Sequence, residues 1–412
     1  MKQIYKSAFL LFLTMAATFT HLNTLSQPQP LFVRLKGVGT GSAVTGMGTG
    51  IQLAGNIAYV FHAGGLEIYS VTNPVAPVRI GGRATELPAN AGALAGRLAF
   101  LALGAKQTLT NDSGAFEIVD VGDPFNPVRV GYANTLARAN DIRIAGNYAY
   151  VAECTRWTGS NLIGALEIFD ISTHTNPFRV ACFDTSGCAT STDVSDHHAY
   201  LADGVTDLQV LDVADPGNPR RVGLYQPDLS RCAFEALGRA TYVHVVGNLA
   251  YSGGGDGLRV LDVTDPSLPV FISDNGCVTI YSLHVAGQYA YSTIWNSSFN
   301  TFQLVIADST HLVNVAYKVH WPTAPMQVVK NLIYVAGNPL LVYEITDQPA
   351  IRSISHSEGY LTLTWDSAPG FVLQRTSSLA DPLWSEVPDS SDRGSIELPM
   401  TQGNEFFRLA RP

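Results

Sequence analysis

The sequence is poor in charged residues, and the basic ones are scarcer than the acidic ones. Only 14% of the 412 residues are charged, and 25 Lys and Arg stand against 34 Asp and Glu, which gives a formal net charge of −9. No extended run of Lys or Arg occurs in the chain. Because a phosphate backbone would repel a chain of this charge, we do not expect nucleic acid as a partner.

Long apolar runs are scarce as well. Outside the N-terminus no segment has the ~20 apolar residues that a membrane helix needs, so we expect no transmembrane segment. The N-terminus itself is typical of an export signal, because Lys2 and Lys6 precede or flank a short apolar stretch at 8–17, and small residues follow at 24–26. We therefore predict a signal peptide over 1–26 and a protein that is secreted or otherwise extracytoplasmic, in the periplasm, at the cell surface or outside the cell.

Signatures of common catalytic sites are missing. The sequence has no G-x-S-x-G and no H-E-x-x-H motif. Its glycine-rich stretches at 39–50 and 253–257 do not precede a helix, so no helix N-terminus is expected there to bind phosphate. Patterns with the period of a helix are essentially absent.

Cysteine is limited to five residues, and none precedes Cys154. A lipid-modified cysteine at the predicted cleavage site is therefore not expected. In an exported chain, five thiols indicate two disulfides and one cysteine left over. We expect Cys182 to pair with Cys188 and Cys232 with Cys277. A zinc cluster is the alternative, although the chain has no tight C-x-x-C motif.

What the sequence does contain is an internal repeat. With the glycine of A-G-N-Y-A-Y at Gly146 as origin, six equivalent positions can be found, namely Gly55, Gly96, Asp196, Gly247, Gly287 and Lys330. Four positions after each origin stands an aromatic residue: Tyr59, Phe100, Tyr150, Tyr200, Tyr251, Tyr291 and Tyr334. The average spacing of about 46 residues lies in the range of β-propeller blades.

Each repeat contains four segments with the alternation of β-strands. In the third repeat they are 141–145, 148–152, 165–171 and 177–183, separated by Gly-Asn and Asn-Pro turns. A four-stranded unit with two apolar faces must stack on copies of itself, and radial stacking gives a propeller. We predict an all-β chain with a seven-bladed β-propeller, in which the segment 30–39 supplies the outer strand of the last blade and closes the ring. Six or eight blades are the alternatives.

The third strand of the repeat also carries a resemblance to a known family. L-E-I-F-D at 166–170, L-Q-V-L-D at 208–212, L-R-V-L-D at 258–262 and L-V-I-A-D at 304–308 resemble the LVIVD-repeat family of bacterial extracytoplasmic propellers. The resemblance covers roughly residues 30 to 348. It implies a propeller, assigned here to 27–348, and an extracellular setting, and it carries no catalytic motif that transfers to this chain.

The repeat is lost beyond position 350. Short alternating segments at 360–365, 371–376, 395–399 and 405–410 predict a small β-sandwich-like domain over 350–412. L-W at 383–384 and F-F-R-L at 406–409 make it similar to accessory modules at the C-termini of secreted bacterial proteins.

An acidic residue ends the third strand in six repeats: Asp120, Asp170, Asp212, Asp262, Asp308 and Glu344. Ser70 is the exception, and a group that recurs in six of seven repeats serves the repeat rather than one site. We expect these carboxylates to accept backbone N–H groups in the turn that follows.

The best candidate site lies three residues before each repeat origin, on the innermost strand. We call these seven the ring residues: Gln52, Ala93, Arg143, Asp193, His244, His284 and Gln327. Their neighbours are mostly apolar, so alternation should turn the ring residues towards the central channel. They could bind water or a small anion, or His244, His284 and Asp193 could bind a metal ion with Arg143 as charge partner of Asp193. A hydrated lining without ligand is the alternative, and no other cofactor is expected.

Long connections are predicted on one face of the propeller, at 103–114, 153–164, 224–240 and 292–301. The three tryptophans of the propeller, Trp157, Trp295 and Trp321, lie on this long-loop face. Variable loops on a rigid scaffold usually carry binding. The leading hypothesis is a monomeric, non-catalytic protein that binds an extracellular protein or glycan through this face. The alternatives are an enzyme, a metal-assisted hydrolase or lyase with its site at the channel, and a structural component of the cell surface.

Overall fold

The computed structural model describes residues 32–41, 48–104, 114–157, 162–204, 207–227, 240–255, 257–276, 278–296, 301–312, 314–319, 322–346, 351–357, 360–365, 372–378, 383–390, 395–399 and 405–410. Every regular element within these ranges is a β-strand, so the all-β prediction is confirmed for them. Over the same ranges the structure contains no helix with the length and apolar character needed to cross a membrane. The predicted signal peptide at 1–26 lies outside the described residues.

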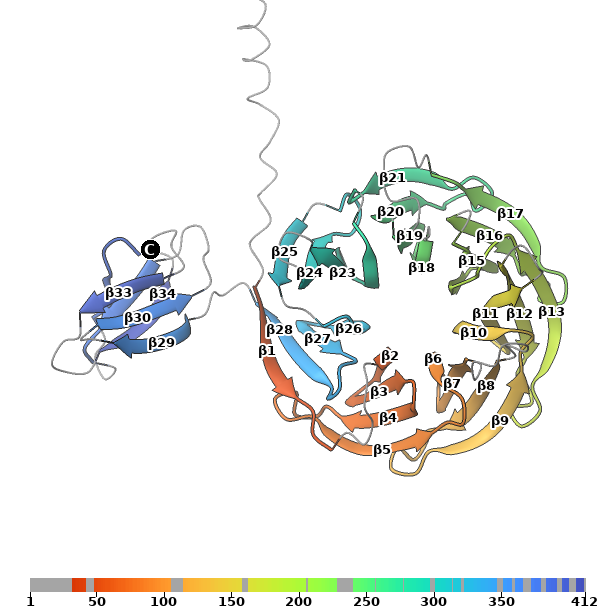
Figure 1. The fold of residues 1–412 in the computed structure, drawn as a ribbon, viewed down its shortest axis with the longest axis horizontal. Helices are drawn as coiled ribbons and strands as arrows, with labels where there is room; N and C mark the ends of the chain where they lie inside the picture. Colours follow the sequence, from red (N-terminus) through yellow and green to blue (C-terminus); the bar gives the residue numbers. More distant parts are fainter. Residues whose placement is uncertain are drawn as a thin grey trace, which may run out of the picture. The chain divides into compact units, whose positions relative to one another are not determined.

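Residues 32–348 form one compact unit. Within its described part, the strands form seven four-stranded antiparallel sheets, a propeller-like repeat fold (Figure 1). Figure 1 shows the sheets following one another around a central space, with β2, β6, β10, β18 and β26 innermost.

The first six sheets are each built from four strands that pair in chain order, the first strand innermost and the fourth outermost. Sheet 1 contains β2 (Gly48–Ala54), β3 (Ile57–His62), β4 (Gly65–Ser70) and β5 (Val78–Ala84). Sheet 2 contains β6 (Ala89–Ala95), β7 (Leu98–Leu103), β8 (Ala115–Asp120) and β9 (Val128–Asn134). Sheet 3 contains β10 (Arg138–Ala145), β11 (Tyr148–Trp157), β12 (Leu162–Asp170) and β13 (Phe178–Thr185).

The second half of the series continues the same order. Sheet 4 contains β14 (Ser191–Ser195), β15 (His198–Ala202), β16 (Leu208–Asp212) and β17 (Arg220–Tyr225). Sheet 5 contains β18 (Ala240–Val246), β19 (Leu249–Gly254), β20 (Gly257–Asp262) and β21 (Val270–Asp274). Sheet 6 contains β22 (Ile280–Ala286), β23 (Tyr289–Asn296), β24 (Thr301–Asp308) and β25 (Asn314–Val319). Sheet 7 contains β26 (Met326–Val329), β27 (Leu332–Val335), β28 (Leu341–Thr346) and, as its outer strand, β1 (Phe32–Val38) from the start of the described chain.

The repeat origin is a backbone position with positive φ in the tight turn between the first and second strands. Gly146 has a φ of 57°, and the two origins that are not glycine, Asp196 and Lys330, have φ values of 45° and 58°. Glycine adopts this left-handed conformation without steric cost, which explains why it fills five of the seven origins.

The repeat aromatics form the inner part of the core. Each lies on a second strand and is at most 6% exposed, for example Tyr59, Phe100 and Tyr251. Apolar clusters join consecutive sheets: one contains Phe61 and Ile68 of sheet 1 with Leu101 and Val119 of sheet 2. The core therefore lies between the sheets, as stacking of two-faced units requires.

The acids at the end of the third strand have the expected turn role. The Oδ1 atoms of four of them accept the amide two residues further on: Asp120 from Gly122 at 2.8 Å, Asp170 from Ser172 at 2.8 Å, Asp212 from Ala214 at 3.0 Å and Asp262 from Thr264 at 2.8 Å. Hydrogen bonds lower the pKa of all four carboxyls, those of Asp170 and Asp262 from the following turn, that of Asp120 mainly from the Arg97 side chain and then the Gly122 amide, and that of Asp212 mainly from the Ala214 amide and then the Arg220 side chain.

The remaining described strands belong to a second compact unit. They form two three-stranded sheets, one of β29 (Ile351–Ser357), β30 (Tyr360–Trp365) and β33 (Ser395–Pro399), the other of β31 (Val372–Thr376), β32 (Ser385–Glu386) and β34 (Phe406–Ala410). Leu363 and Trp365 of the first sheet pack with Leu373 of the second and with Val387. The two sheets thus share one small apolar core.

Candidate functional site

The ring residues lie on the innermost strands, one in each sheet: Gln52 on β2, Ala93 on β6, Arg143 on β10, Asp193 on β14, His244 on β18, His284 on β22 and Gln327 on β26. Each is directly opposite the aromatic of its repeat, in the pairs Gln52–Tyr59, Ala93–Phe100, Arg143–Tyr150, Asp193–Tyr200, His244–Tyr251, His284–Tyr291 and Gln327–Tyr334. Opposed residues share one face of a sheet, so each ring side chain lies beside its aromatic.

Several ring side chains bind the backbone of the next sheet in the series. The amide they bind belongs to the residue directly after the next ring residue. The three bonds are Gln52 Oε1 with Leu94 N at 2.6 Å, Gln327 Oε1 with Leu53 N at 2.6 Å, and Asp193 Oδ2 with Val245 N at 2.8 Å. His284 also interacts with the backbone of Val328, but this hydrogen bond raises the pKa of the imidazole, so here the histidine is the donor and not the acceptor of an amide.

These bonds have a simple cause in strand pairing. An innermost strand has a neighbour on one side only, so every second amide has no partner within its own sheet. The ring side chain of the preceding sheet supplies that partner. The sequence analysis predicted that the ring residues turn towards the central channel, whereas the oxygens of Gln52, Gln327 and Asp193 bind the neighbouring sheet.

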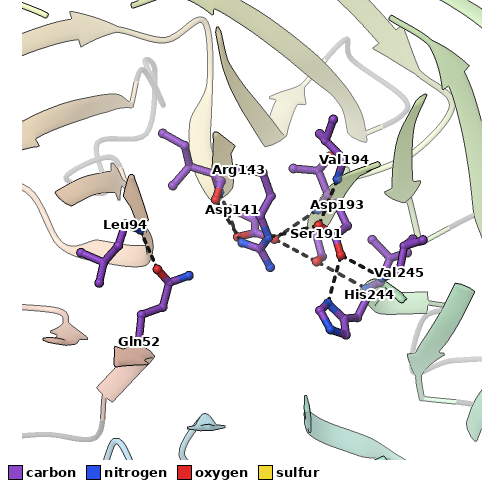
Figure 2. Close-up of polar contacts among 12 residues, drawn as sticks. Gln52, Leu94, Asp141, Arg143, Ser191, Asp193, Val194, His244 and Val245 are labelled. Atoms are coloured by element: carbon purple, nitrogen blue, oxygen red, sulfur yellow. Dashed lines mark hydrogen bonds and ion pairs between the residues drawn. The ribbon is translucent and has the colours of Figure 1, made fainter. Parts of the chain in front are cut away.

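The charged centre of the ring lies between sheets 3 and 4 (Figure 2). Arg143 Nη1 donates to Asp141 Oδ1 at 2.6 Å, and Arg143 Nε lies 3.7 Å from Asp193 Oδ1. Asp141 Oδ2 in turn accepts from Ser191 Oγ at 2.9 Å and from the Thr192 amide at 3.1 Å. Asp141, which is 6% exposed, is thus a buried anchor that joins the two sheets and holds the guanidinium in place.

The two ring histidines come together with Asp193. His244 Nδ1 lies 3.0 Å from Asp193 Oδ2, and the His244 and His284 rings are stacked with centroids 6.4 Å apart. Burial alone would raise the pKa of Asp193, but the His244 hydrogen bond and the Arg143 charge lower it below its ordinary value. Burial, and then His244, lower the pKa of His284 to about 4, so this ring is neutral at ordinary pH.

The predicted metal set is brought together but is not arranged as a metal site. Among the residues that the structure describes, no group of three or more His, Cys, Asp or Glu side chains is placed to hold a metal ion. Asp193 directs its oxygens to the amides of Val194 and Val245 at 3.0 and 2.8 Å, as well as to His244. A carboxylate used in this way has no free direction for a metal shared with the two imidazoles.

The junction of sheets 2 and 3 is the apolar exception. Its ring residue is Ala93, and the aromatic opposite is Phe100 rather than tyrosine. Both are buried in one cluster with Ile142 and Val151 of sheet 3. Sheet 2 therefore has neither the polar ring side chain nor the tyrosine hydroxyl of the other sheets, and apolar contacts join it to sheet 3 at this position.

A layer of buried polar residues on the third strands was missed in the sequence. Each stands at the centre of a strand that is otherwise apolar: Glu67, Glu117, Glu167, Gln209 and Arg259, all at most 6% exposed. Glu67 binds Arg79 of the same sheet at 2.9 Å, whereas Arg259 binds Asp207 of the preceding sheet at 3.3 Å. The sequence pattern that could have predicted this layer is the recurrence of a polar residue at one position of an otherwise apolar strand.

Glu167 is part of a carboxyl pair with Glu153 of β11. Their Oε2 atoms accept the consecutive amides of Leu136 and Ala137, at 3.1 and 3.2 Å. Burial, followed by the hydrogen bond to Glu167 and its charge, raises the pKa of Glu153 to about 10. Glu153 is therefore protonated at neutral pH.

The predicted disulfide between Cys182 and Cys188 is wrong. Cys188 is bonded to Cys154, with Cα atoms 4.5 Å apart, and Cys182 is a free, exposed thiol. The backbone explains the pairing, because the Ala189 amide donates to the Glu153 carbonyl at 3.1 Å and so places Cys188 beside Cys154. The bond joins the second half of β11 in sheet 3 to the segment that leads into sheet 4. Cys232 and Cys277 lie outside the described residues.

The long-loop face is only partly described. Positions 105–113, 158–161, 228–239 and 297–300 lie outside the described residues, and so does Trp321. Trp157 ends β11, and Trp295 stands one position before the end of β23, but their side chains are likewise not described. Binding through these tryptophans stays a prediction.

Comparison with known proteins adds the fold and the repeat. The chain is similar in fold to the computationally designed Ika8 protein (TM-score 0.50, 10% identity, 75% of this chain and 99% of that chain). It is also similar to Sqt1 of Saccharomyces cerevisiae (TM-score 0.52, 7% identity, 89% and 100%). A third similar structure is a functionally unknown protein from Desulfotomaculum acetoxidans DSM 771 (TM-score 0.51, 10% identity, 81% and 96%). At these identities the similarity concerns the fold alone.

No curated protein sequence matches the chain. The LVIVD repeat family matches three consecutive stretches, 137–185, 186–226 and 237–274, which span sheets 3, 4 and 5. The resemblance noted in the third strands is thus confirmed over these sheets. The middle of this chain is built from LVIVD repeats.

Proposed function

We propose that residues 32–346 form a closed seven-bladed propeller that acts as a non-catalytic binding protein outside the cytoplasm. Its partner is a protein or a glycan, and the binding surface is the long-loop face.

Closure is supported by the junction between sheet 7 and sheet 1, which has the same contacts as the other junctions. β1 pairs antiparallel with β28 from Phe32–Thr346 to Val38–Leu341. Gln327 binds the backbone of sheet 1 just as Gln52 binds that of sheet 2. A Cβ built on Gly37 would lie 2.1 Å from the Pro74 carbonyl oxygen, and one on the equivalent Gly81 would lie 2.0 Å from that of Pro124.

Binding rather than catalysis is supported by how the ring side chains are used. The Asp193 carboxylate and the glutamine oxygens hold neighbouring sheets together, so they are part of the scaffold. An enzyme site at the channel would need such groups free to exchange protons with a substrate. This is the observation that carries the proposal, because it leaves the loops as the variable part of a rigid body.

Location is supported by the disulfide between Cys154 and Cys188. Disulfides form and persist in oxidising compartments and are rare in the cytosol of most organisms. The bond also lies at the end of the sheets from which the connection 158–161 leaves, so it stiffens the base of the proposed surface.

The experiment compares the two faces of the propeller. The purified protein is screened on a glycan array and by pull-down from its own culture medium, and the hit is titrated with variants. We expect Trp157→Ala, Trp295→Ala and Trp321→Ala together to weaken binding at least about tenfold, since aromatic anchors dominate such interfaces. The matched control is Phe125→Ala in the tight turn before β9, an exposed aromatic on the opposite face (63% exposed).

The outcome can go against the proposal in two ways. If the Phe125 variant loses binding and the tryptophan variant does not, the long-loop face is not the binding surface. If the hit is chemically converted during the titration, the protein is an enzyme and the non-catalytic assignment fails.

A further inference from the structure

The chain contains a single Asn-Gly step, Asn275–Gly276, which directly follows β21 and begins the connection to β22. Asparagine before glycine is prone to lose its side-chain amide, because glycine has no side chain to hinder attack by the following backbone nitrogen on the amide carbon. Gly276 has a φ of 78° and is exposed, and a Cβ built on it would meet no atom within 4 Å. The backbone around the attacking nitrogen is therefore open to solvent.

The side-chain amide of Asn275 is held in one direction. Asn275 extends the pairing of β21 with β20, because its backbone N–H donates to the Leu258 carbonyl at 3.1 Å. The Leu258 N–H in turn donates to Asn275 Oδ1 at 2.9 Å. When a nucleophile attacks the Cγ atom of an amide, negative charge develops on this oxygen, and a backbone donor that is already in place stabilises the charge. The Leu258 amide is such a donor.

A carboxylate faces the attacking nitrogen. Asp274 Oδ1 accepts the Gly276 N–H at 3.0 Å. The carboxylate is thus within hydrogen-bond reach of the proton that must leave this nitrogen, as a general base has to be. Asp265 accepts the Ser267 amide at 2.9 Å with the same spacing in the sequence, but the residue between those two is a proline.

We infer that Asn275 is a site of spontaneous deamidation, promoted by the carboxylate of Asp274 and the backbone amide of Leu258. The Gly276 nitrogen bonds to Asn275 Cγ, and its proton passes to Asp274. The bond from Cγ to Nδ2 then breaks, Nδ2 takes up the proton, and ammonia leaves a succinimide ring. Water from the solvent adds to one of the two ring carbonyls, so the product is aspartate or isoaspartate.

Either product changes the connection between sheets 5 and 6. Aspartate at position 275 keeps an oxygen for the Leu258 amide but places a second negative charge next to Asp274. Isoaspartate lengthens the main chain, which disturbs the two hydrogen bonds of residue 275 with Leu258. The equivalent connection of sheet 4 is 224–240, one of the long connections assigned to the long-loop face, so the modification adds charge to that face. The inference does not rest on the proposed function.

The test follows Asn275 in the purified full chain during long incubation in neutral buffer. Peptide mapping by mass spectrometry measures the conversion of each asparagine to an acid, and enzymatic methylation measures isoaspartate. We expect Asn275 to convert at least about tenfold faster than Asn248, an exposed asparagine in a turn of the same sheet that is followed by leucine.

Two matched variants test the role of the carboxylate. Asp274→Ser keeps an oxygen that can accept the Gly276 amide but removes the base, so it should slow the conversion of Asn275 about tenfold or more. Asp265→Ser makes the same change in the turn before β21 and should leave the rate unchanged. The unfolding temperature of each variant shows that it is folded during the incubation.

A synthetic peptide of residues 270–281 contains the same Asn-Gly step and Asp274 but lacks the Leu258 amide. We expect it to convert no faster than the folded chain. The inference is overturned if Asn275 converts no faster than Asn248, or if Asp274→Ser converts at the rate of the parent protein. It is also overturned if the peptide converts faster than the folded chain, because the contacts of Asn275 would then protect it.

Discussion

Glu153 and Glu167 show what burial does to a pair of like side chains. Both are at most 1% exposed, and within the described residues Glu153 Oε1 has no hydrogen-bond donor facing it. Two ionised carboxylates in this position would repel each other without water to screen them. One proton on Glu153 removes this repulsion. Arg179, an ion-pair partner of Glu167 from β13, then balances the remaining charge.

The protonated state of Glu153 makes stability depend on pH in a definite direction. Its folded pKa of about 10 lies above the unfolded value near 4.5, so the native state binds the extra proton between these values. Stability from this group is therefore full below about pH 4.5 and falls as the pH rises towards about 10. Glu153→Gln copies the protonated form, so we expect it to raise the free energy of unfolding on the order of 1–3 kcal/mol at about pH 8 and hardly at all at about pH 5.

Urea unfolding of Glu153→Gln and the parent protein at both pH values measures this difference. Glu86→Gln, at an exposed glutamate before β6, is the control for loss of one charge. A gain that is equal at both pH values, or a loss at about pH 8, would show that the pair does not hold a proton.

The ring residues show which part of a site the sequence can predict. Their repeat position places them on the innermost strands, and the sequence gives that position without help from the structure. The hydrogen-bond partners of the ring residues could not be predicted in this way. They are the backbone amides of Leu53, Leu94 and Val245, and the residue type gives no indication that a backbone amide will be bound. The pairing of Cys154 with Cys188 was unpredictable for a related reason. It depends on the Ala189–Glu153 backbone bond between two segments of sequence far apart.

At the scale of elements, the outer strands share a bulge, and in four of them the bulge brings a glycine against the next sheet. The pairing of the third and fourth strands shifts by a bulge at the same point, for example between Gly131 and Arg129 in β9. A small residue stands at the bulge, and in four sheets it is a glycine that lies close to a turn carbonyl of the next sheet: Gly37, Gly81, Gly131 and Gly223. In β9 a Cβ built on Gly131 would lie 1.9 Å from the His174 oxygen. The bulge changes the direction of the strand, and because glycine has no side chain, the backbone of the next sheet can come close.

We therefore expect Gly131→Ala to destabilise the protein by about 2 kcal/mol or more, since the new methyl group must push back a backbone carbonyl. The matched control is Gly217→Ala in the turn before β17, where a Cβ would meet only Asp215 Oδ1 at 3.4 Å. This second change should be neutral or slightly stabilising. Denaturant midpoints of the two variants provide the comparison, and equal midpoints would mean that the close approach at Gly131 has no energetic weight.

At the scale of the molecule, the sequence predicted most of the architecture because the repeat recurs in register. The regular positions of origin, aromatic and turn acid predict the four strands of each repeat, and the segment 30–39 has the pattern of a fourth strand without the other three. A pattern that recurs in seven repeats predicts a strand even where one copy is ambiguous. Residues that occur once, such as Cys182 and Glu153, have no second copy from which their role could be predicted. The long loops have no repeat to support them, and the partner of the long-loop face stays a matter for experiment.

The last prediction concerns closure of the propeller. β1 is the only described strand that pairs with the outer edge of β28, through six residue pairs. Lys36 adds an ion pair with Glu344 at 2.8 Å. Deletion of residues 27–40 would leave that edge with unpaired amides and carbonyls, and such edges associate with other chains. We expect the truncated protein to melt at lower temperature and to elute as oligomers or aggregates in size-exclusion chromatography with light scattering. A synthetic peptide of residues 30–41, added during refolding, should restore the monomeric peak by pairing with the vacant edge. If the truncated chain instead elutes as a monomer and melts as the full chain does, β1 does not close the ring, and the closed seven-bladed propeller must be abandoned.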